Sequence, residues 1–144
     1  MKGLLQISAP STDTYQNLFD IYRETRGLMS LKDIPLHFNS PIIYDGLDSY
    51  AFAVSIAVDE SVSNPRLSYR NENLGQLIID ELANRELVIE TVSNAELYED
   101  CLLQIPRNLI IRDPKWPRYK KIITEALTAA LLLYLNKSLP DKLL

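Results

Sequence analysis

Residues 50–58 constrain the fold of this chain more than any other stretch, because they have the pattern of a strand that carries no charge on either face. Side chains two apart in a strand share a face. One face is large and apolar and the other consists of small side chains, which would allow a helix to lie close against the sheet. We therefore expect this strand at the centre of a sheet. The two faces are Tyr50, Phe52, Val54, Ile56 and Val58 against Ala51, Ala53, Ser55 and Ala57.

Helices are expected where a capping residue precedes apolar residues spaced three and four apart. Ser11 is the expected N-cap of the first helix, and Gly27 is expected just past its end. Pro117 suits the first turn of the last helix. Asn73 with Gln76 and Ser93 with Glu96 have capping-box spacing. The expected helices span residues 12–26, 74–84, about 94–105 and 117–135.

Shorter strands and one long loop account for most of the remaining chain. Residues 59–73 are polar and contain Pro65, so a loop is expected there. The 144 residues suit one domain. The sequence thus predicts a single α+β domain over residues 1–144, with a mixed sheet of about four to five strands packed by about four helices. The other expected strands are 34–38, 41–44, 86–92 and 108–112.

Composition excludes several classes of protein. With 47% hydrophobic and 24% charged residues, the chain resembles an ordinary globular domain and not a disordered one. No stretch approaches the ~20 apolar residues of a membrane span, and the first residues do not form a secretory signal. We therefore expect a cytoplasmic protein without a membrane span. A pI of about 5.0 argues against bulk attraction to nucleic acid.

Residues that commonly perform catalysis are scarce. His37 is the sole histidine and Cys101 the sole cysteine, so they cannot complete a zinc site alone. The four glycines form no phosphate-binding loop. No catalytic residue, metal or cofactor is therefore assigned. A carboxylate-based, metal-dependent enzyme stays as a third hypothesis, because adjacent acids can hold magnesium. The acid pairs are Asp45 with Asp48, Asp59 with Glu60, and Asp80 with Glu81.

Charge is strongly segregated along the second half of the chain. Residues 72–100 contain eight acids and one base, whereas residues 107–121 contain six bases and one acid. Two interpretations are open. The acidic segment can neutralise the basic segment within the fold, or the two can form a bipolar surface that attracts a partner or a second copy.

The basic segment 107–121 is a candidate anion- or partner-binding site. Its cations Arg118, Lys120 and Lys121 fall in the first turn of the last helix, where the helix dipole is positive and cations are disfavoured. Aromatic residues beside them could stack on bases of single-stranded nucleic acid. The candidate residues are Arg112, Lys115, Trp116, Arg118, Tyr119, Lys120 and Lys121.

The end of the last helix is apolar on every side. Lys121, Thr124, Glu125 and Thr128 form a polar stripe that continues into leucine. A helix that is apolar all round must be buried all round. Either it passes through the centre of the domain or its outer face meets another subunit. We expect a symmetric homodimer as the commonest assembly. The candidate interface residues are Leu131, Leu132, Tyr134 and Leu135.

These features favour a small non-enzymatic domain, an adaptor, regulator or neutraliser, that binds another protein. The bipolar charge and the apolar last helix would supply the contact, and the eight tyrosines suit half-wet interfaces. The alternative is a protein that binds nucleic acid or phosphate through residues 107–121.

Overall fold

The computed structural model describes residues 3–9, 11–34, 36–37 and 50–138, and shows the expected α+β class. Ten elements follow one another along the chain. They are β1 (Gly3–Ser8), α1 (Thr12–Ser30), β2 (Leu36–His37), β3 (Phe52–Val58), β4 (Arg66–Tyr69), α2 (Glu72–Asn84), β5 (Glu90–Ser93), β6 (Cys101–Ile105), α3 (Arg107–Arg112) and α4 (Trp116–Ser138).

The strands form one mixed sheet in the order β2-β1-β3-β6-β4-β5. β1, β2, β3 and β6 run parallel, so their carboxyl ends lie at the same end of the sheet. β4 is antiparallel to β6, and β5 is parallel to β4. The expected mixed sheet is thus confirmed; it has six strands, one of which, β2, is only two residues long.

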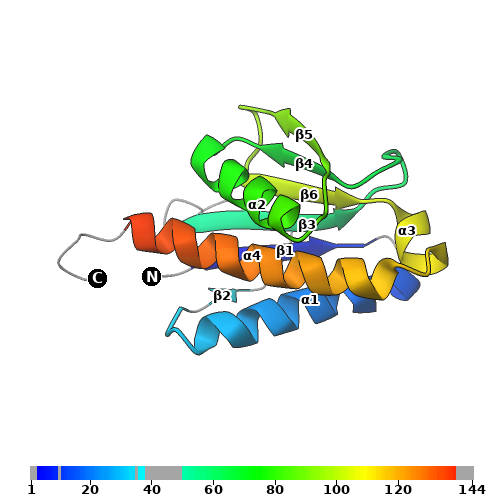
Figure 1. Ribbon diagram of the computed structural model, residues 1–144, viewed down its shortest axis with the longest axis horizontal. Coiled ribbons are helices and arrows are strands. Elements are labelled where there is room, and N and C mark those ends of the chain that lie inside the picture. Colours follow the sequence, from blue (N-terminus) through cyan, green and yellow to red (C-terminus); the bar gives the residue numbers. More distant parts are fainter. Residues whose placement is uncertain (1–2, 10, 35, 38–49, 139–144) are drawn as a thin grey trace.

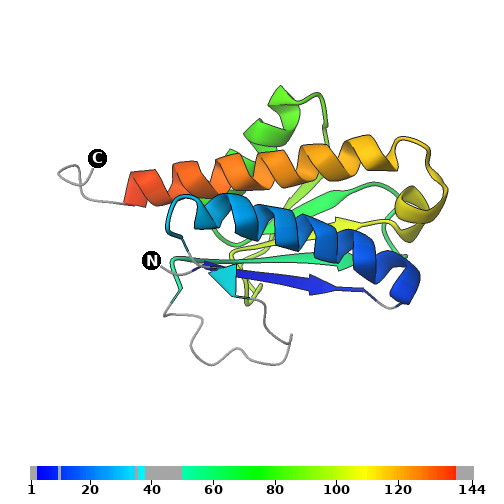
Figure 2. The same cartoon turned by 90° about the horizontal axis from the view of Figure 1, so that it is seen from below.

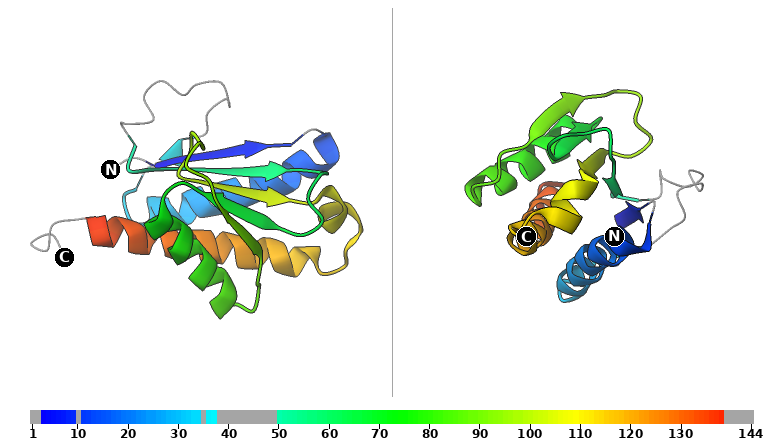
Figure 3. Two further views of the ribbon diagram at one scale, coloured as in Figure 1. Left: turned by 90° about the horizontal axis from the view of Figure 1, so that it is seen from above. Right: turned by 90° about the vertical axis from the view of Figure 1, so that its right-hand side faces the viewer.

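Three helices cover one face of this sheet (Figure 1). α4 lies between α1 and α2, and the views from below and from the end place all three on the same side (Figures 2 and 3). The short α3 lies at the carboxyl ends of the parallel strands. None of the described helices covers the opposite face of the sheet.

β3 occupies the interior of the sheet, as the residue pattern predicts, with β1 on one side and β6 on the other. The prediction of which face meets a helix was wrong. Its large side chains, including Phe52, Val54 and Ile56, belong to the core cluster shared with the helices. The small side chains face the other way, where Ser55 Oγ donates to Gln6 Oε1 at 3.1 Å. Large side chains fill the space between a sheet and its covering helices, which small ones would leave empty.

Several other expected elements differ from those of the structure. β1 was not expected, and β4 lies inside the expected loop 59–73. A strand, β6, replaces the end of the expected third helix, and a helix, α3, replaces the expected strand 108–112. β5 begins later than expected, at Glu90. The expected strand 41–44 lies outside the described residues.

Tertiary pairing explains why β6 is extended. The apolar residues before Pro106 fit a helical spacing, but Cys101, Leu103 and Ile105 also alternate as in a strand, and these three are buried. Asp100 fixes the start of β6 beside β3. Its carboxylate accepts from Ala53 N at 2.8 Å, and its own N–H donates to Ala53 O at 2.8 Å.

Helix ends also differ from the expected caps. α1 continues through Gly27 to Ser30, and Leu31 N donates to Gly27 O. Ser11 is the N-cap residue, but its side chain makes no capping bond to the backbone. Asn71, not Asn73, caps α2, because its Oδ1 accepts from Leu74 N at 3.1 Å.

The last helix lies between α1 and α2, and much of its apolar end is buried against them and the sheet. This is the first of the two alternatives, a central position in the domain. Leu131 and Leu135 are 0% and 1% exposed and belong to the core. Leu132 and Tyr134 are partly buried against it. The expected symmetric dimer therefore loses two of its four interface residues. We find no described helix long and apolar enough to span a membrane.

The polar stripe on α4 is divided between the surface and the interior, because Lys121 and Glu125 are exposed whereas its two threonines are not. Thr124 and Thr128 are buried, and each hydroxyl donates to the backbone carbonyl four residues earlier, at 3.0 and 2.8 Å. Threonine can be buried in a helix in this way because the helix itself accepts its hydrogen bond. Only Lys121 and Glu125 of the stripe therefore mark the solvent face of α4.

Thr25 of α1 differs from the buried threonines of α4, whose hydroxyls are hydrogen-bonded. It is 0% exposed, and its Oγ1 has no hydrogen-bond partner among the residues that the structure describes. Thr25→Val keeps the shape and removes the unpaired hydroxyl, so we expect the free energy of unfolding to rise by about 1 kcal/mol in urea titrations. Thr25→Ser, which keeps the hydroxyl and loses the methyl group, should lower it. A loss of stability in Thr25→Val would contradict this account.

Candidate binding cleft

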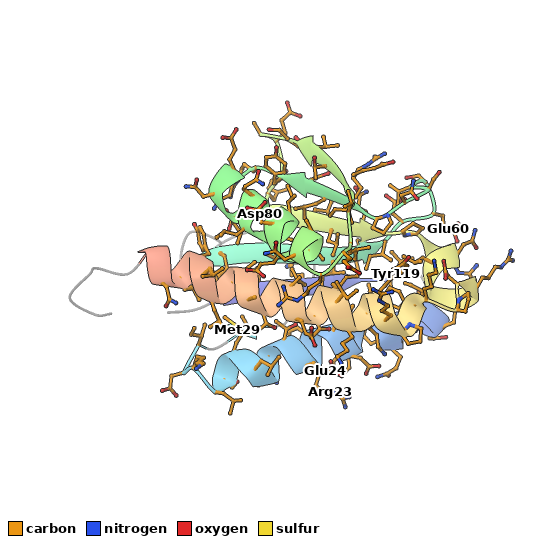
Figure 4. All side chains as sticks on the ribbon, viewed as in Figure 1. Arg23, Glu24, Met29, Glu60, Asp80 and Tyr119 are labelled. Carbon is orange, nitrogen blue, oxygen red and sulfur yellow. The ribbon has the colours of Figure 1, made fainter. Side chains whose placement is uncertain are left out.

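A cavity of about 770 Å³ lies at the end of the molecule where β3 and β6 finish. Two loops and the start of α3 form it: 60–65 between β3 and β4, 87–90 leading into β5, and 106–109 after β6. Asp113 and Tyr119 complete its lining. Glu60 and Tyr119 are both labelled at this end in Figure 4. The carboxyl edge of parallel strands is where α/β sheets commonly bind ligands.

The two oppositely charged segments meet across this cavity, which we call the bipolar cleft. Leu87–Glu90, from the acidic segment, forms part of one wall, whereas Asn108, Asp113 and Tyr119, from the basic segment, form part of the other. Apolar side chains line both walls, including Leu87 and Leu109. The charged residues that line the cleft itself are all acids, Glu60, Glu90 and Asp113, so the cleft can hold an apolar group beside basic ones.

Neutralisation between the two segments is limited to one ion pair. Arg118 Nη2 lies 3.4 Å from Glu86 Oε2, and both side chains are largely exposed. Exposed pairs of this kind contribute about 0–1 kcal/mol. The other paired bases of segment 107–121 contact α1 or the loop after β3 instead: Lys120 Nζ lies 3.1 Å from Asp20, and Arg107 lies 2.8 Å from Asp13 and 3.9 Å from Glu60.

The candidate basic residues therefore separate into distinct groups. Arg112, Lys115 and Lys121 are exposed and form no ion pair with a described residue. Arg118 and Lys120 are paired with acids, as above. Tyr119 is half-buried and lines the cleft. The structure thus brings most of these residues to one end of the molecule, but only part of the set is free to meet a ligand.

Trp116 is not a surface platform. It is 4% exposed, and its Nε1 donates to Asn17 Oδ1 at 2.8 Å. A buried indole whose N–H is already bonded joins the start of α4 to α1 and cannot stack on a base. Its expected part in binding is therefore not supported by its position.

Hydrogen bonds lower the pKa of three carboxylates that lie outside the lining of the cleft. Ser11 and then Arg107 hydrogen-bond Asp13 and lower its pKa. The pKa of Asp59 is lowered by the hydroxyl and N–H of Ser61, and further by Gln104. Partial burial raises the pKa of Asp20, but hydrogen bonds from Gln16 and Lys120 outweigh it, so the net shift is downward. These groups serve as fixed negative charges near neutral pH and not as proton donors.

The acid pairs and the cysteine do not gather into a reactive centre in the described structure. Asp45 and Asp48 lie outside the described residues. Within the described ranges, no group of three or more His, Cys, Asp or Glu side chains could hold a metal ion. Cys101 is buried on β6, and not on a helix as expected, and burial raises the pKa of its thiol to about 12. A protonated thiol is a poor nucleophile.

Sequence reasoning missed about half of the cleft, namely the loops 60–65 and 87–90. The direction of the strands, which the sequence pattern alone did not reveal, would have located these loops. Had residues 3–8 been identified as a strand, β1, α1 and β2 would have formed a parallel unit. The carboxyl-edge rule would then have pointed to the residues after β3 and β6.

Fold and cleft together define an α+β domain with a ligand-sized cavity at the carboxyl edge of its parallel strands. Neither a protein-family model nor a curated protein sequence matches the chain. Among solved structures, it is similar to a bacteriophage poly-gamma-glutamate hydrolase, with a TM-score of 0.54 and 15% identity. The likeness covers 93% of this chain and 85% of that one, and at this identity it shows the fold alone.

Proposed function

We propose that the protein is a small non-enzymatic domain that binds another protein in the bipolar cleft, as an adaptor, regulator or neutraliser. One observation carries this proposal. Segments 72–100 and 107–121, of opposite net charge, supply facing walls of one cavity and share a single weak ion pair. A cavity lined by acids and apolar side chains suits a polypeptide that carries basic and apolar side chains. The apolar end of the last helix, where Leu131 and Leu135 are core, no longer belongs to the proposed contact.

Photo-crosslinking in native lysate tests the proposal. A photoreactive amino acid replaces Asn108, which lines the cleft, or Glu24, which is exposed on α1 as its matched control (Figure 4). We expect polypeptide adducts at position 108 that are absent at position 24. Glu90→Lys, which reverses an exposed charge that lines the cleft, should lower their yield roughly fivefold, since such a charge contributes about 1 kcal/mol. Equal adducts at the two positions would contradict a binding site in the cleft.

A second candidate is the binding of an anionic polymer, including nucleic acid. It is favoured by the three exposed cations Arg112, Lys115 and Lys121, which have no ion pair among the described residues. The structurally similar phage protein is named for poly-gamma-glutamate, itself a polyanion. The carboxylate-based metal enzyme has no comparable supporting observation in the described part of the chain.

The same crosslinking experiment separates these candidates. Nuclease-sensitive adducts at position 108, lost in Lys115→Glu with Lys121→Glu, would favour nucleic acid over protein. Poly-gamma-glutamate and a single-stranded oligonucleotide are added as competitors at low and high salt. Shortening of poly-gamma-glutamate by the purified chain would overturn the non-enzymatic part of the proposal.

A further inference from the structure

β5 forms an open edge of the sheet (Figures 1 and 3). β4 is its neighbour on one side, and no described strand lies on the other. All four of its residues are exposed. Proteins commonly protect such edges with lysine or proline, and β5 contains neither. Its outer backbone groups are therefore available to another strand.

The hydrogen bonds to β4 identify these outer groups. Glu90 N donates to Pro65 O at 3.1 Å, and Asn94 N donates to Tyr69 O at 2.8 Å. In a parallel pair, alternate residues direct their backbone groups to the neighbouring strand. The N–H and C=O of Thr91 and Ser93 consequently point away from β4.

This edge continues directly into the bipolar cleft. Val88, Ile89 and Glu90 line the cavity, and β5 begins at Glu90. Val88 is 85% exposed and Val92 is 43% exposed, so apolar side chains stand beside the open backbone. A strand paired with β5 would reach the cleft at its end.

The acidic side chains around the edge of β5 favour a basic partner. Glu86, Glu90 and Glu96 are exposed beside or on β5, within the segment of eight acids and one base. The ion pairs of Glu90 with Arg66 and of Glu86 with Arg118 are exposed, at 3.2 and 3.4 Å, and a basic partner can exchange with them at little cost. A second copy would bring the same acids to this edge, where like charges repel.

We propose that an extended, basic segment of the partner protein adds to the sheet along the outer edge of β5 and places an apolar side chain in the bipolar cleft. This inference rests on the proposed function and specifies its binding mode. Main-chain hydrogen bonds to Thr91 and Ser93 supply affinity, and alternate side chains supply selectivity.

The test uses an eight-residue peptide with blocked ends that alternates lysine and valine, and its glutamate–valine counterpart. We expect the lysine peptide to slow amide hydrogen exchange at Thr91 and Ser93 of the whole chain, and the glutamate peptide to leave both unchanged. Thr91→Pro removes one outward N–H and should weaken binding about tenfold, whereas Thr91→Val should bind as the original chain does. Thermal unfolding verifies that both variants fold, and the exchange measurement needs no variant.

Three outcomes would overturn this inference. They are unchanged exchange at Thr91 and Ser93, equal binding of the two peptides, and a dimer in light scattering that Thr91→Pro dissolves, which would assign the edge to a second copy. Crosslinking at Asn108 keeps the two proposals distinguishable. Protein adducts there that persist in Thr91→Pro would uphold the cleft and exclude strand addition.

Discussion

Replacing Leu131 by alanine is expected to lower the free energy of unfolding by about 2–5 kcal/mol. Leu131 is 0% exposed in the core where α4 lies between α1 and α2. Truncation would leave a cavity that α1, α2 and the sheet cannot easily fill, because closing it would require packed helices to shift against the sheet. Urea unfolding followed by circular dichroism measures the loss.

The same variant separates a core residue from an interface residue. If Leu131 stabilises the single chain, its effect is the same at protein concentrations tenfold apart, whereas an interface residue gives a concentration-dependent loss. Leu133→Ala is the matched control, because Leu133 lies two residues along the same helix and is 39% exposed. We expect a change within about 0.5 kcal/mol there. A concentration-dependent effect of Leu131→Ala would restore the dimer hypothesis.

Gly75→Ala is expected to lower the free energy of unfolding by about 1–3 kcal/mol. A Cβ at this position would lie 2.7 Å from Tyr69 Cγ and 2.8 Å from its Cβ. The Cβ of Tyr69 is bonded to the backbone of β4, so rotation of the side chain cannot move this atom away. We expect this loss of stability even though alanine stabilises a helix by about 1 kcal/mol relative to glycine.

Two further variants isolate the close approach of α2 to β4 as the cause. Gly27→Ala in α1, where a Cβ would meet nothing within 4 Å, should raise stability by about 0.5–1 kcal/mol. When Tyr69 is also replaced by alanine, Gly75→Ala should lower the free energy of unfolding by much less than it does alone. If Gly75→Ala lowers it equally with and without Tyr69, the close contact with Tyr69 is not the cause.

Local sequence signals predicted the helices better than the strands. Ser11 and the apolar spacing located α1, and Pro117 and the long leucine-rich run located α4. A helix satisfies its backbone within its own segment, so its pattern is complete in the local sequence. The strand β3 was located for a similar reason, since its alternation extends over seven consecutive residues.

Short strands were missed because their partners are distant in sequence. β6 pairs with β3 and with β4, and both partners precede it by more than 30 residues. The residues of β6 fit a helix or a strand equally well until these partners are present. The bipolar cleft shares this limit, because its walls come from loops that only the sheet order brings together.

The sequence by itself determined the α+β class, the central strand, the first and last helices, and the separation of acidic from basic segments. These follow from periodicity and charge, which are properties of neighbouring residues. Only the tertiary structure decided that Leu131 and Leu135 are core, that Trp116 is buried, and that the two charged segments face one cleft. Burial and juxtaposition depend on which elements pack together, and non-local strand pairing sets that arrangement.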